Sequence, residues 1–335
     1  MQSKNYTKLK LLYIQKFLEK FSDEDNPMSV ERLTELLLDV GIECEKKSIY
    51  SDVKTIREFG VDVITTKAPT NGYYIANREF QLPEVKLLAD AMQSANFITQ
   101  KKTDELIEKI CTLCSESQAK YVKNQELNHN NLKCTNEEIY YTIDIINKAI
   151  LQNKQIKFTY CKKRLNKSKK TVDTIERQHI VSPYSTIWEN GYYYLVSNNQ
   201  KYDNLMHTRI DKMKKITISR KKARDFSEVC ADLGDTNSYR NKVFNMYSGE
   251  MMEVELIFST DHLEKMMERF GVDEKITIHS NKLTMTTKCA VSEGLASWLM
   301  SFGGDVEVVS PQCLIDMIKD KAKAICELYE QNSDA

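Results

Sequence analysis

The amino-acid sequence predicts an α+β fold that is divided into several domains. The chain has 335 residues, which is more than one ordinary domain needs and enough for two or three. Blocks with the 3.6-residue period of amphipathic helices are interspersed with short blocks that alternate as strands do. Hydrophobic residues make up 41% of the chain, so apolar side chains suffice for more than one core.

Charge is distributed unevenly, although the formal net charge of the chain is zero. Lys, Arg, Asp and Glu give a net charge of −1 for residues 1–80, −2 for 81–149, +13 for 150–224 and −10 for 225–335. The basic block predicts an anionic partner, an acidic neighbouring domain, or both. In the second case the acidic C-terminal third could mask the basic block.

Cysteine usage and hydropathy indicate a cytoplasmic protein. The nine cysteines are an odd number, and charges interrupt the apolar residues of the first 21 positions, so neither a signal peptide nor a disulfide framework is expected. No run of about 18 apolar residues predicts a membrane span or a membrane partner. The one CxxC, from Cys111 to Cys114, lies in a helical pattern without a second ligand pair, which favours buried thiols over zinc.

The sequence does not predict an enzyme. It contains no glycine-rich phosphate loop, no metal-ligand cluster and no Gly-x-Ser-x-Gly pattern. We therefore expect no catalytic residues, no cofactor and no metal.

Residues 1–80 predict a winged helix-turn-helix domain. Apolar stripes indicate helices over 8–21, from an N-cap at Ser29 to Gly41, and over 47–59. An Asn71-Gly72 turn then joins two short strands as a hairpin. In this arrangement the third helix enters the major groove and the hairpin contacts the backbone.

The third helix carries the predicted DNA contacts. Its cations, hydroxyl groups and tyrosine suit phosphates and base edges. The alternative is that these residues are the solvated face of an ordinary helix. The residues are Lys46, Lys47, Ser48, Tyr50, Ser51, Lys54 and Arg57.

Residues 81–135 predict a helical linker that could also pair two copies of the chain. Apolar residues from Leu82 to Leu113 recur at helical spacing, and the polar, Asn-rich stretch 124–136 is a plausible boundary. Residues 136–224 then predict a helix followed by a small antiparallel barrel. In this segment 162–170 is expected to be a basic loop, and Ser182-Pro183-Tyr184 to interrupt a strand.

The Asn190-Gly191 turn predicts the register of the strands on either side. Glu189 should face Tyr192, Trp188 should face Tyr193, and Ile187 should face Tyr194. Residues 250–332 predict a compact α+β domain with the order βαββαβα.

The chain resembles WYL-domain transcriptional regulators over its whole length. Tyr193-Tyr194-Leu195 stands where the family has its naming tripeptide, with tyrosine in place of tryptophan. Arg209-Ile210-Asp211-Lys212 matches the family's Arg-hydrophobic-Asp-Arg stretch, with lysine in place of the second arginine. Further matches are Val181-Ser182-Pro183-Tyr184 and, in the C-terminal extension, Trp298, Phe302-Gly303-Gly304, Val306-Glu307-Val308 and Pro311.

The resemblance implies an SH3-like barrel in the WYL domain and a regulator that binds operator DNA as a homodimer. It also implies that the WYL domain senses an effector, which in this family is often proposed to be a nucleotide or nucleic acid. The +13 charge of residues 150–224 independently predicts an anionic effector. The candidate ligand-binding residues are Tyr184, Tyr193, His207, Arg209 and Lys212.

Two alternatives remain at this point. Arg209 offers a bidentate fork for phosphate, but it could instead pair with Asp211, in which case Tyr193 would be a core residue. At the level of function, the chain could be a nucleic-acid-binding accessory protein of a defence system that binds mainly through its WYL domain.

Overall fold

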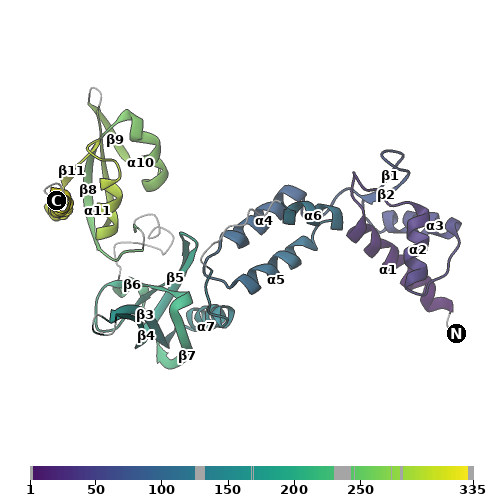
Figure 1. Ribbon diagram of the computed structural model, residues 1–335, viewed down its shortest axis with the longest axis horizontal. Helices are drawn as coiled ribbons and strands as arrows, with labels where there is room; N and C mark the ends of the chain where they lie inside the picture. The colour runs from purple at the N-terminus through teal and green to yellow at the C-terminus, as the bar shows by residue number, and fades with distance from the viewer. Residues whose placement is uncertain are drawn as a thin grey trace. The chain divides into compact units, whose positions relative to one another are not determined.

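The computed structural model describes residues 3–124, 133–229 and 243–330, apart from Lys167, Lys169, Asn245, Asp273, Ser280 and Asn281. The chain divides into two compact units, residues 1–135 and 136–335 (Figure 1). Helices and strands both contribute substantially to the fold, so the predicted α+β class is confirmed. Most of the Asn-rich stretch expected as a boundary lies outside the described residues.

The first unit begins with three helices and a hairpin in the predicted order. Ser29 caps the second helix, because its hydroxyl accepts a hydrogen bond from the backbone N–H of Arg32 at 3.1 Å. Gly41 follows that helix with a φ of +78°, a conformation that glycine adopts without strain. The elements are α1 (Ser3–Phe21), α2 (Val30–Asp39), α3 (Lys46–Glu58), β1 (Val63–Thr66) and β2 (Gly72–Ile75).

One hydrophobic core joins these five elements. The predicted inner face of α3 is correct, since Ile49, Val53 and Ile56 are all buried. They pack with residues of α1, α2 and the hairpin, among them Ile14, Leu18, Leu33, Leu37 and Tyr73.

Three further helices complete the first unit around a second core. This core contains both cysteines of the CxxC motif, Cys111 and Cys114, which are buried. The last helix was not predicted, because only Ala119 and Val122 of its nine residues are buried and they give a short apolar signal. The helices are α4 (Leu82–Ser94), α5 (Gln100–Cys111) and α6 (Glu116–Asn124).

The second unit opens with a helix and a five-stranded antiparallel sheet. The strand order is β6-β5-β4-β3-β7, so β6 and β7 are the two edges and the sheet is not closed into the predicted barrel among the described residues. A 3₁₀ turn, η1, joins the two edge strands. The elements are α7 (Ile139–Leu151), β3 (Lys154–Asn166), β4 (Thr171–Glu189), β5 (Tyr192–Asn198), β6 (Leu205–Arg209), η1 (Ile210–Lys212), β7 (Met213–Lys222) and α8 (Phe226–Val229).

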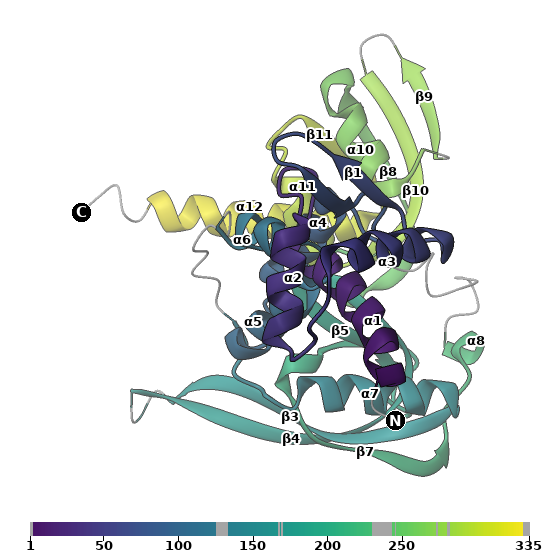
Figure 2. The ribbon, with the colours of Figure 1, turned by 90° about the vertical axis from the view of Figure 1, so that its right-hand side faces the viewer.

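Two expectations for this sheet are wrong. Residues 162–166 are not a loop but the end of β3, which pairs with β4 as far as Asn166 opposite Thr171, so the two strands form a long arm (Figure 2). Lysine and arginine are tolerated there because most of the arm is solvent-exposed, and strand propensity depends on such context. Likewise, β4 continues through Pro183, with a register shift between Pro183 and Ser185 where it pairs with β5.

The C-terminal part of the second unit has the predicted βαββαβα order. Its four strands form a sheet of order β11-β8-β10-β9. Ser292 caps α11 through a 3.3 Å hydrogen bond from the N–H of Leu295. The elements are β8 (Glu250–Ser259), η3 (Thr260–His262), α10 (Leu263–Phe270), β9 (Lys275–His279), β10 (Lys282–Val291), α11 (Glu293–Met300), β11 (Val306–Ser310) and α12 (Gln312–Glu330).

A shared hydrophobic cluster connects the two sheets of the second unit. Ile187, Val196 and Leu205 of the first sheet pack with Val243, Met246 and Ala290. Within the described residues, no helix combines the length and the apolar composition that a membrane span requires.

Candidate functional site

The exposed face of α3 carries four of the seven predicted DNA contacts. Lys47, Tyr50, Ser51 and Lys54 are all exposed, and their spacing of three, four and seven residues puts them on one side of the helix. The buried residues of α3 lie on the other side. The arrangement presents two cations, a phenol and a hydroxyl group to solvent.

The other three predicted contacts are bonded to residues outside α3. The ammonium group of Lys46 bonds Glu31 of α2 at 2.6 Å, and this hydrogen bond raises the pKa of Lys46. The Ser48 hydroxyl donates to the carbonyl of Glu45 at 2.8 Å and accepts from Lys10 at 2.9 Å.

Arg57 holds the hairpin. Its Nε donates to the carbonyl of Val63 at 2.6 Å, and its Nη2 donates to the hydroxyl of Thr65 at 2.6 Å. The sequence could not distinguish these structural uses from DNA contact, because the partners belong to other elements.

A buried ion pair removes an opposing charge from the surface of α3. Asp52 lies in the middle of α3, is 9% exposed, and pairs with Lys10 of α1 at 2.8 Å. Its charge is therefore compensated within the protein and is not exposed on the surface of α3. The surface of α3 thus exposes one carboxylate fewer than its sequence contains.

The three tyrosines of β5 follow the predicted register. Glu189 is opposite Tyr192, Trp188 is opposite Tyr193, and Ile187 is opposite Tyr194. Tyr193 meets Trp188 edge-on, with 6.2 Å between the ring centroids. Because side chains alternate along a strand, Tyr192 and Tyr194 share the opposite face.

Arg209 lies on the face of Tyr192 and Tyr194, not on that of Tyr193. It is directly opposite Tyr194 in the pairing of β5 with β6. Its guanidinium carbon lies 3.4 Å from the centroid of the Tyr192 ring, a cation–π stack. The aromatic partner of Arg209 is thus Tyr192, which the sequence analysis did not select.

Asp211 fixes the guanidinium from the other side. Nε and Nη2 of Arg209 bond the two carboxylate oxygens of Asp211 at 3.0 and 2.7 Å. Burial lowers the pKa of Arg209, but the hydrogen bonds and the charge of Asp211 outweigh burial, and the net shift is upward. The ion pair between Arg209 and Asp211, which the sequence left open as an alternative to ligand binding by Arg209, is therefore present. It leaves further donors, because a guanidinium has five N–H groups.

Other cations and phenols surround this arginine. Burial and the charge of Arg209 lower the pKa of Lys212. The charges of Lys162 and Lys163 lower it further. Burial raises the pKa of Tyr194 and of Tyr160, and a hydrogen bond with the backbone of Arg209 partly offsets the rise for Tyr160. These phenols stay protonated at neutral pH and can act as hydrogen-bond donors to an anion.

The arm of β3 and β4 carries further cations, on a face that also presents Asp173 opposite Arg164. Tyr160, Lys162 and Arg164 lie on one face of β3, because they are two residues apart. Arg177 is directly opposite Tyr160 and shares that face. The ammonium group of Lys162 lies 5.8 Å from the centroid of the Tyr160 ring. We call Arg209, Lys212, Lys162, Arg164 and Arg177 the basic track.

The remaining two predicted ligand residues contact the segment that leads to the C-terminal sheet. His207 Nδ1 lies 3.2 Å from the Ser248 hydroxyl, and burial lowers the pKa of His207 to about 4. The ring of Tyr184 packs edge-on against Phe226 with 5.2 Å between centroids. The five predicted residues thus do not form one group: Arg209 and Lys212 are neighbours, whereas Tyr193 is on the other face of β5.

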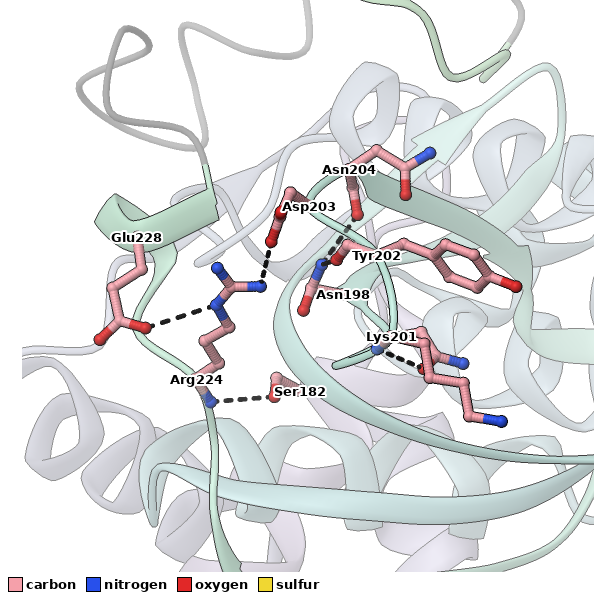
Figure 3. A network of polar contacts seen from close by, with 9 residues as sticks. Ser182, Asn198, Lys201, Tyr202, Asp203, Asn204, Arg224 and Glu228 are labelled. Atoms are coloured by element: carbon pink, nitrogen blue, oxygen red, sulfur yellow. Dashed lines mark hydrogen bonds and ion pairs between the residues drawn. The ribbon is translucent and has the colours of Figure 1, made fainter.

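A polar network stabilises the point where the chain leaves the sheet (Figure 3). The guanidinium of Arg224 bonds Asp203 at 2.8 Å and Glu228 at 3.4 Å, while its backbone N–H donates to the Ser182 hydroxyl at 2.9 Å. Asn198 holds the same loop through the carbonyls of Tyr202 and Asn204, at 2.7 and 2.9 Å. Both anchors, Ser182 and Asn198, are fully buried. The charge of Arg224 is therefore used in ion pairs within the protein.

Both sheets of the second unit match known families. The family model described as WYL domain matches residues 141–218, and the one described as WCX domain matches residues 250–326. A WYL domain and a WCX domain are therefore present, as the resemblance implied for this part of the chain. No curated protein sequence matches the chain.

Solved structures also match the chain. One of them is Proteasome accessory factor B/C (PafBC) of Arthrobacter aurescens, with 16% sequence identity and a TM-score of 0.23. The match covers 93% of this chain and 45% of that one, so the present chain spans less than half the length of that relative.

Proposed function

We propose that this WYL-domain protein, which also carries a WCX domain, is a DNA-binding transcriptional regulator whose WYL domain senses an anionic effector. The proposed division is a DNA-binding domain at 1–80, a helical linker at 81–135, the WYL domain at 136–224 and the C-terminal extension at 250–332. We further propose that the regulator works as a homodimer in the cytoplasm, with the linker as a candidate pairing element.

The observation that carries the effector site is the fixed guanidinium of Arg209. Asp211 and Tyr192 hold it in one orientation, so little entropy is lost when it binds a phosphate or carboxylate. Lys212 adds positive charge next to it, and Lys162 lies near enough to Lys212 to lower its pKa. A phosphate-bearing effector, either a nucleotide or a nucleic acid, suits this group of side chains.

The length of the basic track favours a chain of phosphates over a single nucleotide. From Tyr160 to Asn166 the arm extends about 20 Å, at about 3.3 Å per residue. Lys162 and Arg164 on β3 and Arg177 on β4 share one face of it. A mononucleotide that contacts Arg209 would leave most of these cations without a phosphate.

Operator recognition is assigned to the exposed face of α3. Lys47 and Lys54 would contact phosphates, while Tyr50 and Ser51 between them would reach base edges. The effector would change this binding only to the extent that it binds the two conformations of the regulator with different affinity.

A gel shift on duplex DNA from upstream of the chain's own gene tests the proposal. The Lys47→Ala/Lys54→Ala variant should bind at least about tenfold more weakly, and its salt slope should fall by about two, since two phosphate contacts are lost. The matched control is Lys101→Ala/Lys109→Ala, which removes the same charge from exposed positions of α5. Equal binding by the test variant and the parent would refute the assignment of α3.

The second candidate is a nucleic-acid-binding accessory protein that acts mainly through the WYL domain, for example in a defence system. The concentration of cations on the basic track favours it, because the net charge of residues 1–80 is only −1. In this case single-stranded binding would survive the Lys47→Ala/Lys54→Ala change, would be lost in Lys162→Gln/Arg164→Gln, and would decrease with salt. The parent would show no preference for upstream duplex DNA.

A further inference from the structure

A buried carboxylate joins the end of α1 to the start of α6. Asp23 follows α1 and is 3% exposed. Its Oδ1 accepts hydrogen bonds from the backbone N–H groups of Asp25 and Asn26, at 3.1 and 2.9 Å. Its Oδ2 accepts a hydrogen bond from the hydroxyl of Ser115, which is fully buried. One side chain thus closes its own turn and also bonds a residue 92 positions later in the chain.

Ser115 directly precedes α6. Its hydroxyl accepts from the backbone N–H of Gln118 at 3.1 Å, and its own N–H donates to the Gln118 side chain at 3.3 Å. This is a reciprocal capping arrangement. The Asp23 carboxylate therefore lies at the positive end of the α6 dipole, where a negative charge is stabilised.

Two further polar contacts cross the same junction. Nη2 of Arg78 donates to the carbonyl of Ser22 at 2.6 Å, and the Asn26 amide donates to the Ser117 hydroxyl at 3.0 Å. Burial lowers the pKa of Arg78, and the nearby charge of Asp23 counteracts the shift. Arg78 lies in the segment between the hairpin and α4. Its hydrogen bond to Ser22 therefore connects this segment to the end of α1.

The junction lies between two hydrophobic clusters of the first unit. The core of α1–α3 and the hairpin, and the core of α4–α6, are separate clusters that share no residue. Two hollows of about 440 and 500 Å³ lie beside the junction, and Glu19 of α1 and Thr112, which follows α5, line both. The polar contacts of Asp23 thus join two parts of the first unit whose buried apolar side chains belong to different clusters.

We propose that Asp23 is a positioning residue that clamps the DNA-binding domain onto helices α4–α6, so that the first 124 residues turn as one body. While the clamp is closed, any rearrangement of α4–α6 reorients α3 by the same angle. The part of this inference that concerns DNA rests on the proposed function. In a dimer the clamp would fix the separation of the two α3 helices, and with it the spacing of the half-sites.

Hydrogen exchange on the full-length protein tests the clamp without DNA. In Asp23→Ala and in Ser115→Ala, amides of residues 22–26 and 113–118 should exchange at least about tenfold faster, since a buried hydrogen bond to a charged group is lost. The two variants should not be additive, because they remove the same contact. Glu24→Gln is the control: it removes an exposed charge from the same turn. Unchanged protection at the junction, or equal acceleration throughout α2 and α3, would overturn the proposal.

A DNA measurement separates positioning from mere stability. Asp23→Ala should bind a duplex with both half-sites of the upstream footprint about tenfold more weakly than the parent does, whereas a duplex with one half-site should be bound equally well. Equal losses on both duplexes would mean that Asp23 only stabilises the domain. If the parent binds neither duplex, the proposed function fails, and the exchange experiment still decides whether the clamp exists.

Discussion

The two regions that we assign to anion binding hold their cations in opposite ways. On α3, Lys47 is exposed and the Lys54 side chain is 78% exposed, with Glu58 3.8 Å away as its partner. In the WYL domain, Arg209 is only 24% exposed and is fixed by two hydrogen bonds to Asp211 and by the ring of Tyr192. One region has mobile charges in water, and the other has an immobilised charge in a partly apolar setting.

This difference teaches what each region can recognise. Exposed lysines attract any polyanion, and salt screens their attraction strongly, so specificity has to come from their neighbours. An immobilised guanidinium imposes a direction on its ligand and is screened less, because part of the solvent is excluded. We therefore expect α3 to be sensitive to salt, and the Arg209 site to be sensitive to ligand geometry.

The largest expected effect comes from Arg209→Lys, which keeps the charge and removes the fork. Binding of a fluorescent single-stranded ten-nucleotide probe should weaken about 100-fold, because lysine can neither pair with Asp211 through two bonds nor stack on Tyr192 in the same way. Fluorescence anisotropy measures it. Lys214→Gln, an exposed cation of β7, is the control and should bind as the parent does. If Arg209→Lys also keeps the parent's affinity, the geometry of the guanidinium does not matter for binding, and the Arg209 site does not differ from α3 in this respect.

The buried side of α3 gives the next largest effect. Lys10→Met should lower the free energy of unfolding by about 3 kcal/mol, since Asp52 would remain buried without its ion partner. Thermal or urea unfolding measures this change. Lys10→Met/Asp52→Leu should recover most of the loss, because a matched apolar pair needs no counter-charge. A double variant as unstable as the single one would contradict this account of the pair.

A pH titration tests whether His207, on the same face of β6 as Arg209, is buried. In the unfolded chain His207 becomes protonated below about pH 6.5, whereas burial keeps it neutral in the folded protein until about pH 4. The unfolded state then binds more protons, so the free energy of unfolding should fall as the pH is lowered from 6.5 to 4, by as much as about 3 kcal/mol. His207→Asn should remove this part of the pH dependence. Parallel curves for the variant and the parent would show that the ring is solvated.

Lys46 gives the smallest expected effect. Its ammonium group is already bonded to Glu31, so Lys46→Ala should weaken duplex binding by less than about threefold. Lys47→Ala should weaken duplex binding by a larger factor. Gel shifts at low salt measure both variants. A larger loss for Lys46→Ala than for Lys47→Ala would mean that Lys46 exchanges Glu31 for phosphate in the complex.

Features that depend on neighbours in the sequence were predictable. The Ser29 cap, the end of α2 just before Gly41, and the pairing of Tyr192 with Glu189 all follow from local backbone chemistry and turn geometry. The order of helices and strands in residues 3–75 and 250–330 followed in the same way, since hydrophobic periodicity is a local signal. The resemblance to WYL-domain regulators also rested on short local motifs, and the WYL and WCX matches bear it out.

Only the tertiary structure decided which charges are free to act. The sequence could not reveal that Lys10 neutralises Asp52, that Arg57 holds the hairpin, or that Arg209 stacks on Tyr192 instead of lying near Tyr193. It also did not predict the arm, because charged residues are compatible with either a loop or an exposed strand. The physical reason is common to these cases. The partner of a polar side chain, and its exposure to water, depend on segments that are distant in the sequence and meet only when the chain packs.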